Sequence, residues 1–317
     1  MITALLILAV LFVAFTNGAN ANFKGVASLY GSGTTSLRTA LYWGTGCTFA
    51  GSLTAFLLSE GMLKTFSGRG IVPETLVKSP EFVCAVALGA ALTSFLATRW
   101  GFPVSTTHAL VGALLGAGLM GAGGQVHWQG LGQSFLYPLF FSPLVAMALG
   151  AATYPLLRLL KLAPDHRTKT LDALHFASAG AASFARGLND TPKMVALFLV
   201  APSVEIHYGF LAVAATIAVG GLLDARRVAE TLGKKVTDMN PGQGFAASLV
   251  TAVFVTTASF HSLPVSTTHV SVGSLVGMGS VTHQAKWRKV AEILTAWVST
   301  VPCGAILAAV AYWILSR

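Results

Sequence analysis

Two copies of one six-residue sequence carry side chains that could bind an anion. Pro-Val-Ser-Thr-Thr-His occurs at 103–108 and again at 264–269, each time within apolar sequence. Proline suits the first turn of a helix, and Ser or Thr caps the free N–H groups there. A helix that begins inside a membrane presents those N–H groups and the positive end of its dipole to an anion. One copy would be explained by capping alone, whereas two copies favour binding. The candidate residues are Ser105, Thr106, Thr107, Ser266, Thr267 and Thr268.

A second set of polar residues interrupts two apolar segments. The residues are Asn17, Asn20, Asn22 and Lys24 in the first segment, and Arg186, Asn189, Asp190 and Lys193 in a later one. Polar groups at membrane depth must face protein or water, and ionisable ones there are functional candidates. The alternative is that the three basic side chains reach the lipid headgroups. Lys24 and Lys193 each follow an Asn by four residues, and this matched spacing favours a binding site.

The composition is that of an integral membrane protein. Charged residues make up 10% and hydrophobic residues 54%, with a mean hydropathy of +0.70, whereas soluble domains carry about 25% charged residues. We therefore predict an all-α protein of the cell membrane with about ten membrane segments. They lie near 2–27, 39–58, 81–99, 103–122, 131–157, 171–200, 207–223, 243–260, 264–283 and 289–314. We expect broken helices in the first and sixth, and re-entrant segments or hairpins at the fourth and ninth.

The first apolar segment resembles a secretory leader that ends at Ala19-Asn20-Ala21. No Lys or Arg precedes it, however, and it has a counterpart in the second half, so we expect a membrane helix.

The basic residues predict the orientation of the chain. With both termini outside the cell, the inside connections would hold most of them: Arg38, Arg99, Arg158, Lys161, Arg167, Lys169, Arg226, Arg227, Lys234, Lys235, Lys286, Arg288 and Lys289. The outside would hold Lys64, Arg69, Lys78 and Arg317. This bias satisfies the positive-inside rule, with both termini on the extracytoplasmic side. It also explains the net charge of +9 without nucleic acid as a partner.

The two halves of the chain repeat each other. Residues 15–27 align with 184–196 at an offset of 169, and the hexapeptides align at an offset of 161. Five segments in each half predict that the halves enter the bilayer from opposite sides, as in many secondary transporters. We expect a first repeat at 1–160, a cytoplasmic linker at 161–170 and a second repeat at 171–317. Gly18 and Gly187 would let the backbone leave helical geometry before each Asn.

These features together resemble the inorganic phosphate transporter (PiT) family over essentially the whole chain. That family includes phosphate carriers coupled to sodium or protons, and relatives that move sulfate. Its broken helices typically read Gly-Ala-Asn-Asp or Gly-Gly-Asn-Asp, with another Asn three residues later. The resemblance implies that these Asn and Asp residues bind phosphate and coupling cations, and that the Ser-Thr-Thr clusters bind phosphate.

Most of the family's site positions are matched, and three kinds of position depart. Asn20, Asn189, Asp190 and both Ser-Thr-Thr clusters match. Ala21 stands where the family has its first Asp, Lys24 and Lys193 stand where it has the later Asn residues, and Arg186 replaces a usual His. Fixed positive charges near the expected cation sites put sodium coupling in doubt.

We therefore predict a carrier of an inorganic oxyanion, with phosphate favoured, that works by alternating access. Asn20 and Asn189 would orient the anion, and Lys24 and Lys193 would offset its charge. Asp190 would accept a substrate proton or hold a cation. His108 and His269 could relay protons, or they could be packed neutral groups. Protons are favoured over sodium as the coupling ion.

Three alternatives stay open: a sulfate permease of the same family, a passive anion channel, and a sensor that binds phosphate without moving it. The sequence has no nucleotide-binding motif, which argues against a primary pump. We predict neither an enzyme activity nor a cofactor. The cysteines Cys47, Cys84 and Cys303 lie far apart in sequence, which indicates neither a disulfide framework nor a metal site. A homodimer is kept open as the assembly.

Overall fold

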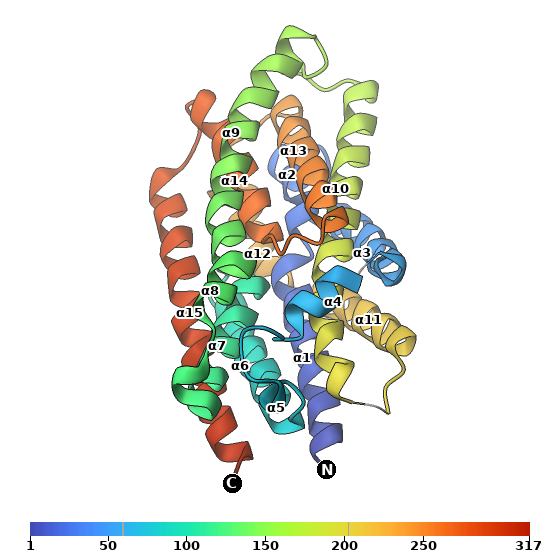
Figure 1. Ribbon diagram of the computed structural model, residues 1–317. Coiled ribbons are helices and arrows are strands. Elements are labelled where there is room, and N and C mark those ends of the chain that lie inside the picture. Colours follow the sequence, from blue (N-terminus) through green and yellow to red (C-terminus); the bar gives the residue numbers. More distant parts are fainter. Residues whose placement is uncertain (59, 202) are drawn as a thin grey trace.

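The chain forms a bundle of helices (Figure 1). The computed structural model describes residues 1–58, 60–201 and 203–317, and these contain helices without a β-strand. The α-helices are α1 Ile2–Ala21, α2 Ala27–Gly31, α3 Leu37–Thr54, α4 Glu60–Phe66, α5 Glu74–Val77, α6 Pro80–Arg99, α7 Thr106–Ala122, α8 Trp128–Leu131, α9 Tyr137–Leu159, α10 Lys169–Val195, α11 Ile206–Asp224, α12 Arg226–Glu230, α13 Pro241–Phe260, α14 Thr267–Val281 and α15 Trp287–Leu315.

Each predicted membrane segment coincides with a long helix, and the short helices lie in the connections. Within the described residues, 7 stretches are long and apolar enough to cross a membrane by themselves. α3, α10 and α14 are not among these, because α14 has only 15 residues and α10 carries many polar groups. The all-helical membrane fold is confirmed, while length and apolarity support fewer crossings than the segments that we predicted.

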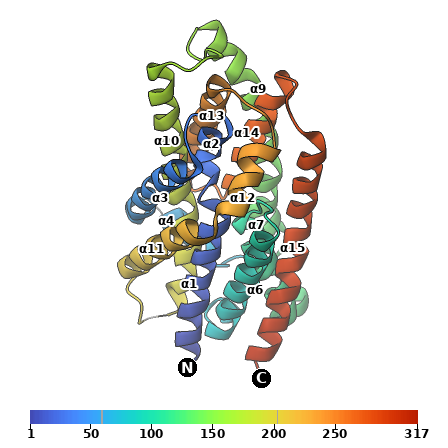
Figure 2. The same ribbon diagram turned by 180° about the vertical axis from the view of Figure 1, so that it is seen from behind.

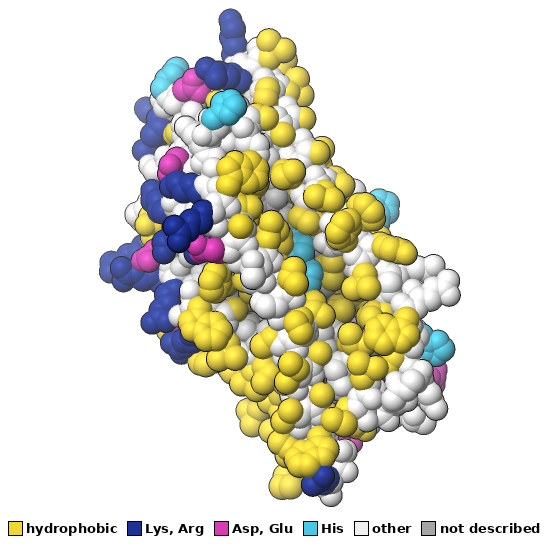
Figure 3. All heavy atoms as spheres, turned by 90° about the vertical axis from the view of Figure 1, so that its left-hand side faces the viewer, with side chains coloured by type: hydrophobic (Ala, Val, Ile, Leu, Met, Phe, Trp, Pro, Cys, Tyr) yellow, Lys and Arg dark blue, Asp and Glu magenta, His cyan; other side chains and the backbone are white. Residues whose placement is uncertain are grey.

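Both chain termini lie at the same end of the bundle (Figures 1 and 2). Lys and Arg side chains gather toward the opposite end on the face drawn in Figure 3, and hydrophobic side chains cover much of the rest. We call the end that holds the α9–α10 and α14–α15 connections the basic end, and the other the terminal end. The charge asymmetry expected from the sequence is therefore present along the bundle.

The first membrane segment is a broken helix, as predicted, but the sixth is not. α1 ends at Ala21, a single 3₁₀ turn covers Lys24–Val26, and α2 follows. α10 instead runs unbroken to Val195. Arg186, Asp190 and Lys193 lie one turn apart on this helix, and ion pairs of 3.6 and 3.0 Å join them. Such pairs favour helical geometry, so the polar residues stabilise α10 where we expected them to interrupt it.

The prediction for Gly18 and Gly187 is also wrong, because both remain helical. They allow close contact between helices instead. A Cβ at Gly18 would lie 2.0 Å from the Ile217 carbonyl oxygen, and one at Gly187 would lie 2.2 Å from the Thr48 carbonyl oxygen. Glycine at these two positions therefore brings α1 against α11 and α10 against α3.

The repeated hexapeptides lie at the turns of two helix pairs. α6 and α7 pack together in the half of the bundle nearer the termini, and α13 and α14 pack together in the half nearer the basic end (Figure 1). Ser105 caps α7 by accepting a hydrogen bond from the His108 N–H at 3.1 Å, and Ser266 caps α14 through the His269 N–H at 3.2 Å. The N-terminal ends of α7 and α14 consequently approach each other near the middle of the molecule.

Two hydrophobic clusters hold these helix pairs in place. The first packs α1, α6, α7 and α11 around residues such as Leu6, Phe82 and Leu110. The second packs α2, α10, α13 and α14 around residues such as Phe23 and Phe245. Polar side chains are buried between the two clusters.

Candidate functional site

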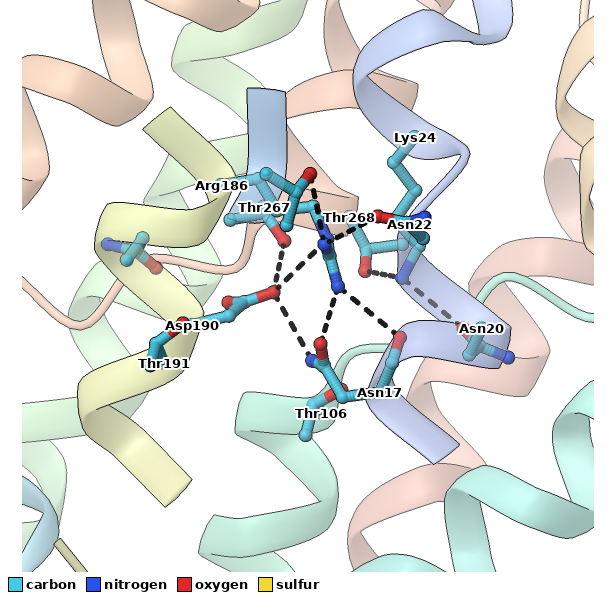
Figure 4. Close-up of polar contacts among 12 residues, drawn as sticks. Asn17, Asn20, Asn22, Lys24, Thr106, Arg186, Asp190, Thr191, Thr267 and Thr268 are labelled. Atoms are coloured by element: carbon cyan, nitrogen blue, oxygen red, sulfur yellow. Dashed lines mark hydrogen bonds and ion pairs between the residues drawn. The ribbon is translucent and has the colours of Figure 1, made fainter. Parts of the chain in front are cut away.

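The buried polar side chains converge from α1, α7, α10 and α14 (Figure 4). We call this group the polar cluster. Its members are Asn17, Asn20, Asn22, Lys24, Thr106, Thr107, Arg186, Asn189, Asp190, Lys193, Thr267 and Thr268, and each is at most 5% exposed. Residues from both hexapeptides and from both polar segments thus share one location.

Lys193 lies among four oxygen atoms. Its Nζ is 2.6 Å from Asn189 Oδ1, 2.9 Å from Thr107 Oγ1, 3.0 Å from Asp190 Oδ1 and 3.0 Å from the carbonyl oxygen of Val265. Asn189 lies one turn earlier on α10. Val265 belongs to the second hexapeptide, whereas Thr107 belongs to the first. This ammonium group is held by protein oxygens and does not reach the lipid headgroups.

Lys24 has a matching environment at the other end of the cluster. Its Nζ is 3.2 Å from Asn20 Oδ1, 2.8 Å from the carbonyl oxygen of Val104 and 2.5 Å from Thr268 Oγ1. Each lysine therefore contacts the Asn four residues earlier, the Val carbonyl of one hexapeptide and the second Thr of the other. The amide groups match too, because Asn20 Nδ2 donates to Thr98 Oγ1 at 2.9 Å and Asn189 Nδ2 donates to Ser259 Oγ at 3.1 Å.

No carboxylate near Lys24 corresponds to Asp190, because Ala21 occupies the matching position. Its Oδ2 accepts hydrogen bonds from Thr267 Oγ1 at 3.2 Å and from Asn17 Nδ2 at 3.3 Å (Figure 4). Its carboxylate also pairs with Lys193 and with Arg186. Asp190 is thus part of a buried ion-pair network, and a contact with substrate remains a prediction.

Arg186 joins α10 to α1. Its guanidinium group donates to Asn17 Oδ1 and, at 3.3 Å, to Asn22 Oδ1. Asn17 also donates to Thr106 Oγ1 at 2.9 Å. A fully buried arginine of this kind organises the donors around Asp190.

The remaining predicted residues lie at the edge of the cluster. Ser105 and Ser266 are helix caps, and their hydroxyl oxygens accept hydrogen bonds from the N–H groups of His108 and His269. His108 and His269 face each other with ring centroids 4.5 Å apart, and the His269 ring stacks on Trp297. Within the described residues, neither histidine bonds to a lysine of the cluster or to Asp190.

The cluster also contains Arg186, Asn17, Asn22 and the Val carbonyl groups, to which the sequence analysis assigns no binding role. The three side chains belong to the polar residues that interrupt the apolar segments, and Arg186 is a functional candidate there because it is ionisable. The signal was present, because Asn17 and Arg186 are aligned by the same offset that aligns the two lysines. The backbone carbonyls of Val104 and Val265 carry no signal in the amino-acid sequence.

Two cavities border the polar cluster. The first is lined mainly by hydrophobic residues such as Phe66, Leu110 and Leu197, and we call it the apolar cavity. It is also lined by Lys193, Ser67, Arg69 and Lys78. The second, the hydroxyl-lined cavity, is bounded by Lys24 and by Ser28, Ser248, Thr251, Ser271 and Ser274. The two cavities share no lining residue, and each lysine borders one of them.

The fold and site define a multi-pass membrane protein with charged groups buried between the ends of two helix pairs. Comparison with known proteins gives the family. Residues 17–308 match the phosphate transporter family, and the chain belongs to that family, whose members are transporters and not enzymes.

Similar proteins differ in what their names say they move. A probable low-affinity inorganic phosphate transporter of Rhizobium meliloti (strain 1021) is 29% identical, over 97% of this chain and 95% of the relative. The sulfate permease CysP of Bacillus subtilis (strain 168) is 31% identical, over 85% of this chain and 75% of the relative. A solved structure described as the sodium-dependent phosphate transporter has the same fold, with a TM-score of 0.84, 23% identity and 99% of both chains covered.

Proposed function

We propose that this chain is a secondary active carrier of inorganic phosphate that works by alternating access and couples to protons rather than sodium. The observation that carries the proposal is a surplus of buried positive charge. Lys24, Arg186 and Lys193 lie in the polar cluster with one carboxylate, Asp190, among them. Buried charge without a partner is costly, and an oxyanion bound beside these groups would supply the missing negative charge.

The donors around Asp190 are the kind that bind phosphate oxygens. Thr267, Asn17, Arg186 and Lys193 all direct hydrogen-bond donors or positive charge at the carboxylate. Hydrogen bonds between charged partners are short and strong, so an anion that shares these donors competes with Asp190. The carboxylate can then take up a proton or accept a hydrogen bond from a protonated phosphate oxygen. Binding of phosphate and of a proton would be linked at this residue.

An inverted repeat would allow such a site to open to either side. The matched environments of Lys24 and Lys193 support two halves, at 1–160 and 171–317, that pack around a shared centre. Separate cavities at Lys193 and Lys24 suit alternating access, in which one half moves against the other. The basic end would face the cytoplasm, with both termini outside.

The environments of the two lysines support independence from sodium. Amide, hydroxyl and backbone carbonyl oxygens surround each ammonium group, and such oxygens are also ligands for sodium in transporters. A tethered ammonium already places positive charge there, so no sodium ion is needed to hold the site together.

Sulfate is the second candidate substrate, because a sulfate permease is among the similar proteins. Asp190 favours phosphate, since phosphate near neutral pH still carries a proton that a carboxylate can accept in a hydrogen bond. Sulfate offers only lone pairs and negative charge, and a site that leaves a buried group unpaired discriminates strongly. A passive channel is disfavoured because Lys193 and Lys24 line two different cavities that share no lining residue.

The test is uptake of labelled phosphate and sulfate into proteoliposomes that contain the purified protein. Sodium and proton gradients are imposed separately. We expect saturable phosphate uptake that rises with an inward proton gradient and changes little with sodium. Strong, saturable stimulation by sodium at constant pH would contradict the coupling proposal, and uptake that does not saturate would indicate a channel.

A further inference from the structure

An unbroken series of hydrogen bonds leads from the surface near the basic end to the hydroxyl-lined cavity. Ser32, which is only partly buried, lies 2.8 Å from Thr34 through their hydroxyl oxygens. Thr34 Oγ1 lies 3.2 Å from His175 Nδ1, and His175 Nε2 lies 2.9 Å from Ser28 Oγ. Ser28 Oγ then lies 2.6 Å from Ser248 Oγ, and both serines line the cavity.

Every member of this series can both donate and accept a hydrogen bond. A hydroxyl group gives up its own proton as it accepts another, and an imidazole accepts at one ring nitrogen while it donates from the other. His175 is the one titratable member, it is fully buried, and both of its ring nitrogens are engaged. This is the arrangement of a proton relay.

The cavity connects the relay to the polar cluster. Lys24 lines one side of it, and Ser271 Oγ donates to the Lys24 carbonyl oxygen at 2.9 Å. The space admits about one water molecule, and the surrounding hydroxyl groups supply the polar partners that such a water requires. Ser248 and Lys24 thus line the same water-sized space.

Three of the matching positions around Lys193 are apolar. At the same offsets, Leu6 corresponds to His175, Leu197 to Ser28, and Ala87 to Ser248. Leu6 and Ala87 are buried, and Leu197 lines the apolar cavity. Ordinary helix packing in this fold therefore does not need hydroxyl or imidazole groups at these positions.

Few charged groups face His175 among the described residues. Asp172 lies one turn earlier on α10, where Arg167 holds its carboxylate. From α13, Gly244 packs against the ring and brings no charge. From α2, Ser28 is the partner already described, and Lys234 contacts the Gly31 carbonyl oxygen near the exposed end of the series. The imidazole can consequently exchange a proton with its hydroxyl partners without a permanent ion pair.

We infer that Ser32, Thr34, His175, Ser28 and Ser248 form a proton path between the basic end and the Lys24 side of the polar cluster. The inference rests on the proposed proton coupling and adds the route to it. A proton released from the site, either by the Lys24 ammonium or by a protonated phosphate, passes through the cavity to Ser248 and Ser28. His175 accepts it at Nε2 and releases another from Nδ1 through Thr34 to solvent. The reverse sequence loads the site, and each hydroxyl group ends with the one proton with which it began.

The test separates phosphate exchange from net proton-coupled uptake in proteoliposomes. His175→Leu installs the residue found at the matching position, and His207→Gln, at an exposed histidine outside the relay, is the control. Exchange of internal for external phosphate requires only that the loaded carrier reorients, so the proton can stay on the protein. We expect H175L to exchange phosphate within about twofold of the wild type while pH-driven uptake and the accompanying proton flux fall about tenfold. The control variant should match the wild type in both assays.

A second pair of variants guards against misfolding of H175L. Ser248→Ala and Thr34→Val each remove one hydroxyl group, and each should lower driven uptake more than exchange. Net uptake by the wild type should also slow more in heavy water than exchange does. Equal loss of exchange and driven uptake in all three folded variants would assign the residues a structural role and overturn the path. Unchanged driven uptake would overturn it as well.

The wild-type protein reports separately on the proposed function. If it exchanges no phosphate, the carrier proposal fails whatever the variants do. If it exchanges phosphate but moves no protons, carrier function stands while proton coupling and the path both fail.

Discussion

The environments of Lys24 and Lys193 differ in one respect that decides their electrostatics. Both ammonium groups contact an Asn amide, a Val carbonyl and a Thr hydroxyl from the opposite hexapeptide. Only Lys193 also contacts a carboxylate, that of Asp190 at 3.0 Å. The uncompensated charge therefore lies nearer Lys24.

The same arrangement of oxygen atoms therefore surrounds two lysines whose charges are balanced differently. The Lys193 environment already contains a carboxylate, in a buried ion pair that Arg186 extends. The Lys24 environment has only neutral oxygens, so an anion is the partner that it lacks. The following predictions either remove this difference or make it measurable.

The largest expected effect is on stability. Lys193→Met leaves Asp190 buried with Arg186 as its remaining ion-pair partner, and breaking a buried pair in this way costs about 3–5 kcal/mol. Lys24→Met removes an ammonium that has no carboxylate, so its cost should be clearly smaller. Thermal unfolding of both variants in detergent measures the difference. Equal losses would mean that Asp190 does not distinguish the two lysines.

Asp190→Asn should change the choice of anion. The amide keeps the shape of the side chain but loses the negative charge that accepts a hydrogen bond from protonated phosphate. We expect phosphate affinity to fall about tenfold and sulfate to gain relative to it, since charged hydrogen bonds contribute about 1.5–3 kcal/mol. Binding of both anions to folded protein is the measurement. Equal loss of both would leave Asp190 as a structural ion pair, and unchanged phosphate binding would remove it from the site.

Replacing both lysines should make phosphate uptake depend on sodium. In the double variant Lys24→Asn with Lys193→Asn, the oxygens that now surround the ammonium groups become free to bind a cation. Phosphate uptake by this variant should rise roughly threefold or more with sodium, because such oxygens suit that ion. The wild type should respond little in the same proteoliposomes. If neither protein responds, the ammonium groups do not replace sodium.

The smallest effects are expected at Thr107 and Thr268, whose hydroxyl groups contact the two lysines. Thr107→Val and Thr268→Val each remove one hydroxyl contact to a lysine and should cost about 1 kcal/mol of stability. Because Thr268 contacts the uncompensated ammonium, T268V should also weaken phosphate binding more than T107V does. Similar binding by the two variants would argue against Lys24 as the main partner of the anion.

The sequence predicted the convergence of the polar cluster better than its local structure. The repeated hexapeptides and the aligned Asn and Lys residues indicated a shared centre, because equivalent residues of two repeats meet where the repeats pack. The continuity of α10 could not be predicted, since it depends on ion pairs that form only when Arg186, Asp190 and Lys193 are buried together. The role of Arg186 depends on a side chain long enough to reach Asn17 on another helix. His175 gave no signal in isolation, because its partners Thr34 and Ser28 come from a distant part of the chain.

The unequal charges of the polar cluster have an electrical consequence. With Lys24, Arg186, Lys193 and Asp190 all ionised, the empty site carries two positive charges more than negative ones. A bound dianion and the coupled proton together leave one positive charge, so the loaded carrier would move one charge inward. The empty carrier would move two positive charges outward on its return, and each elementary charge that crosses the full potential is worth about 2.3 kcal/mol per 100 mV. A negative cell interior would therefore slow the return of the empty carrier more than the step that carries the anion.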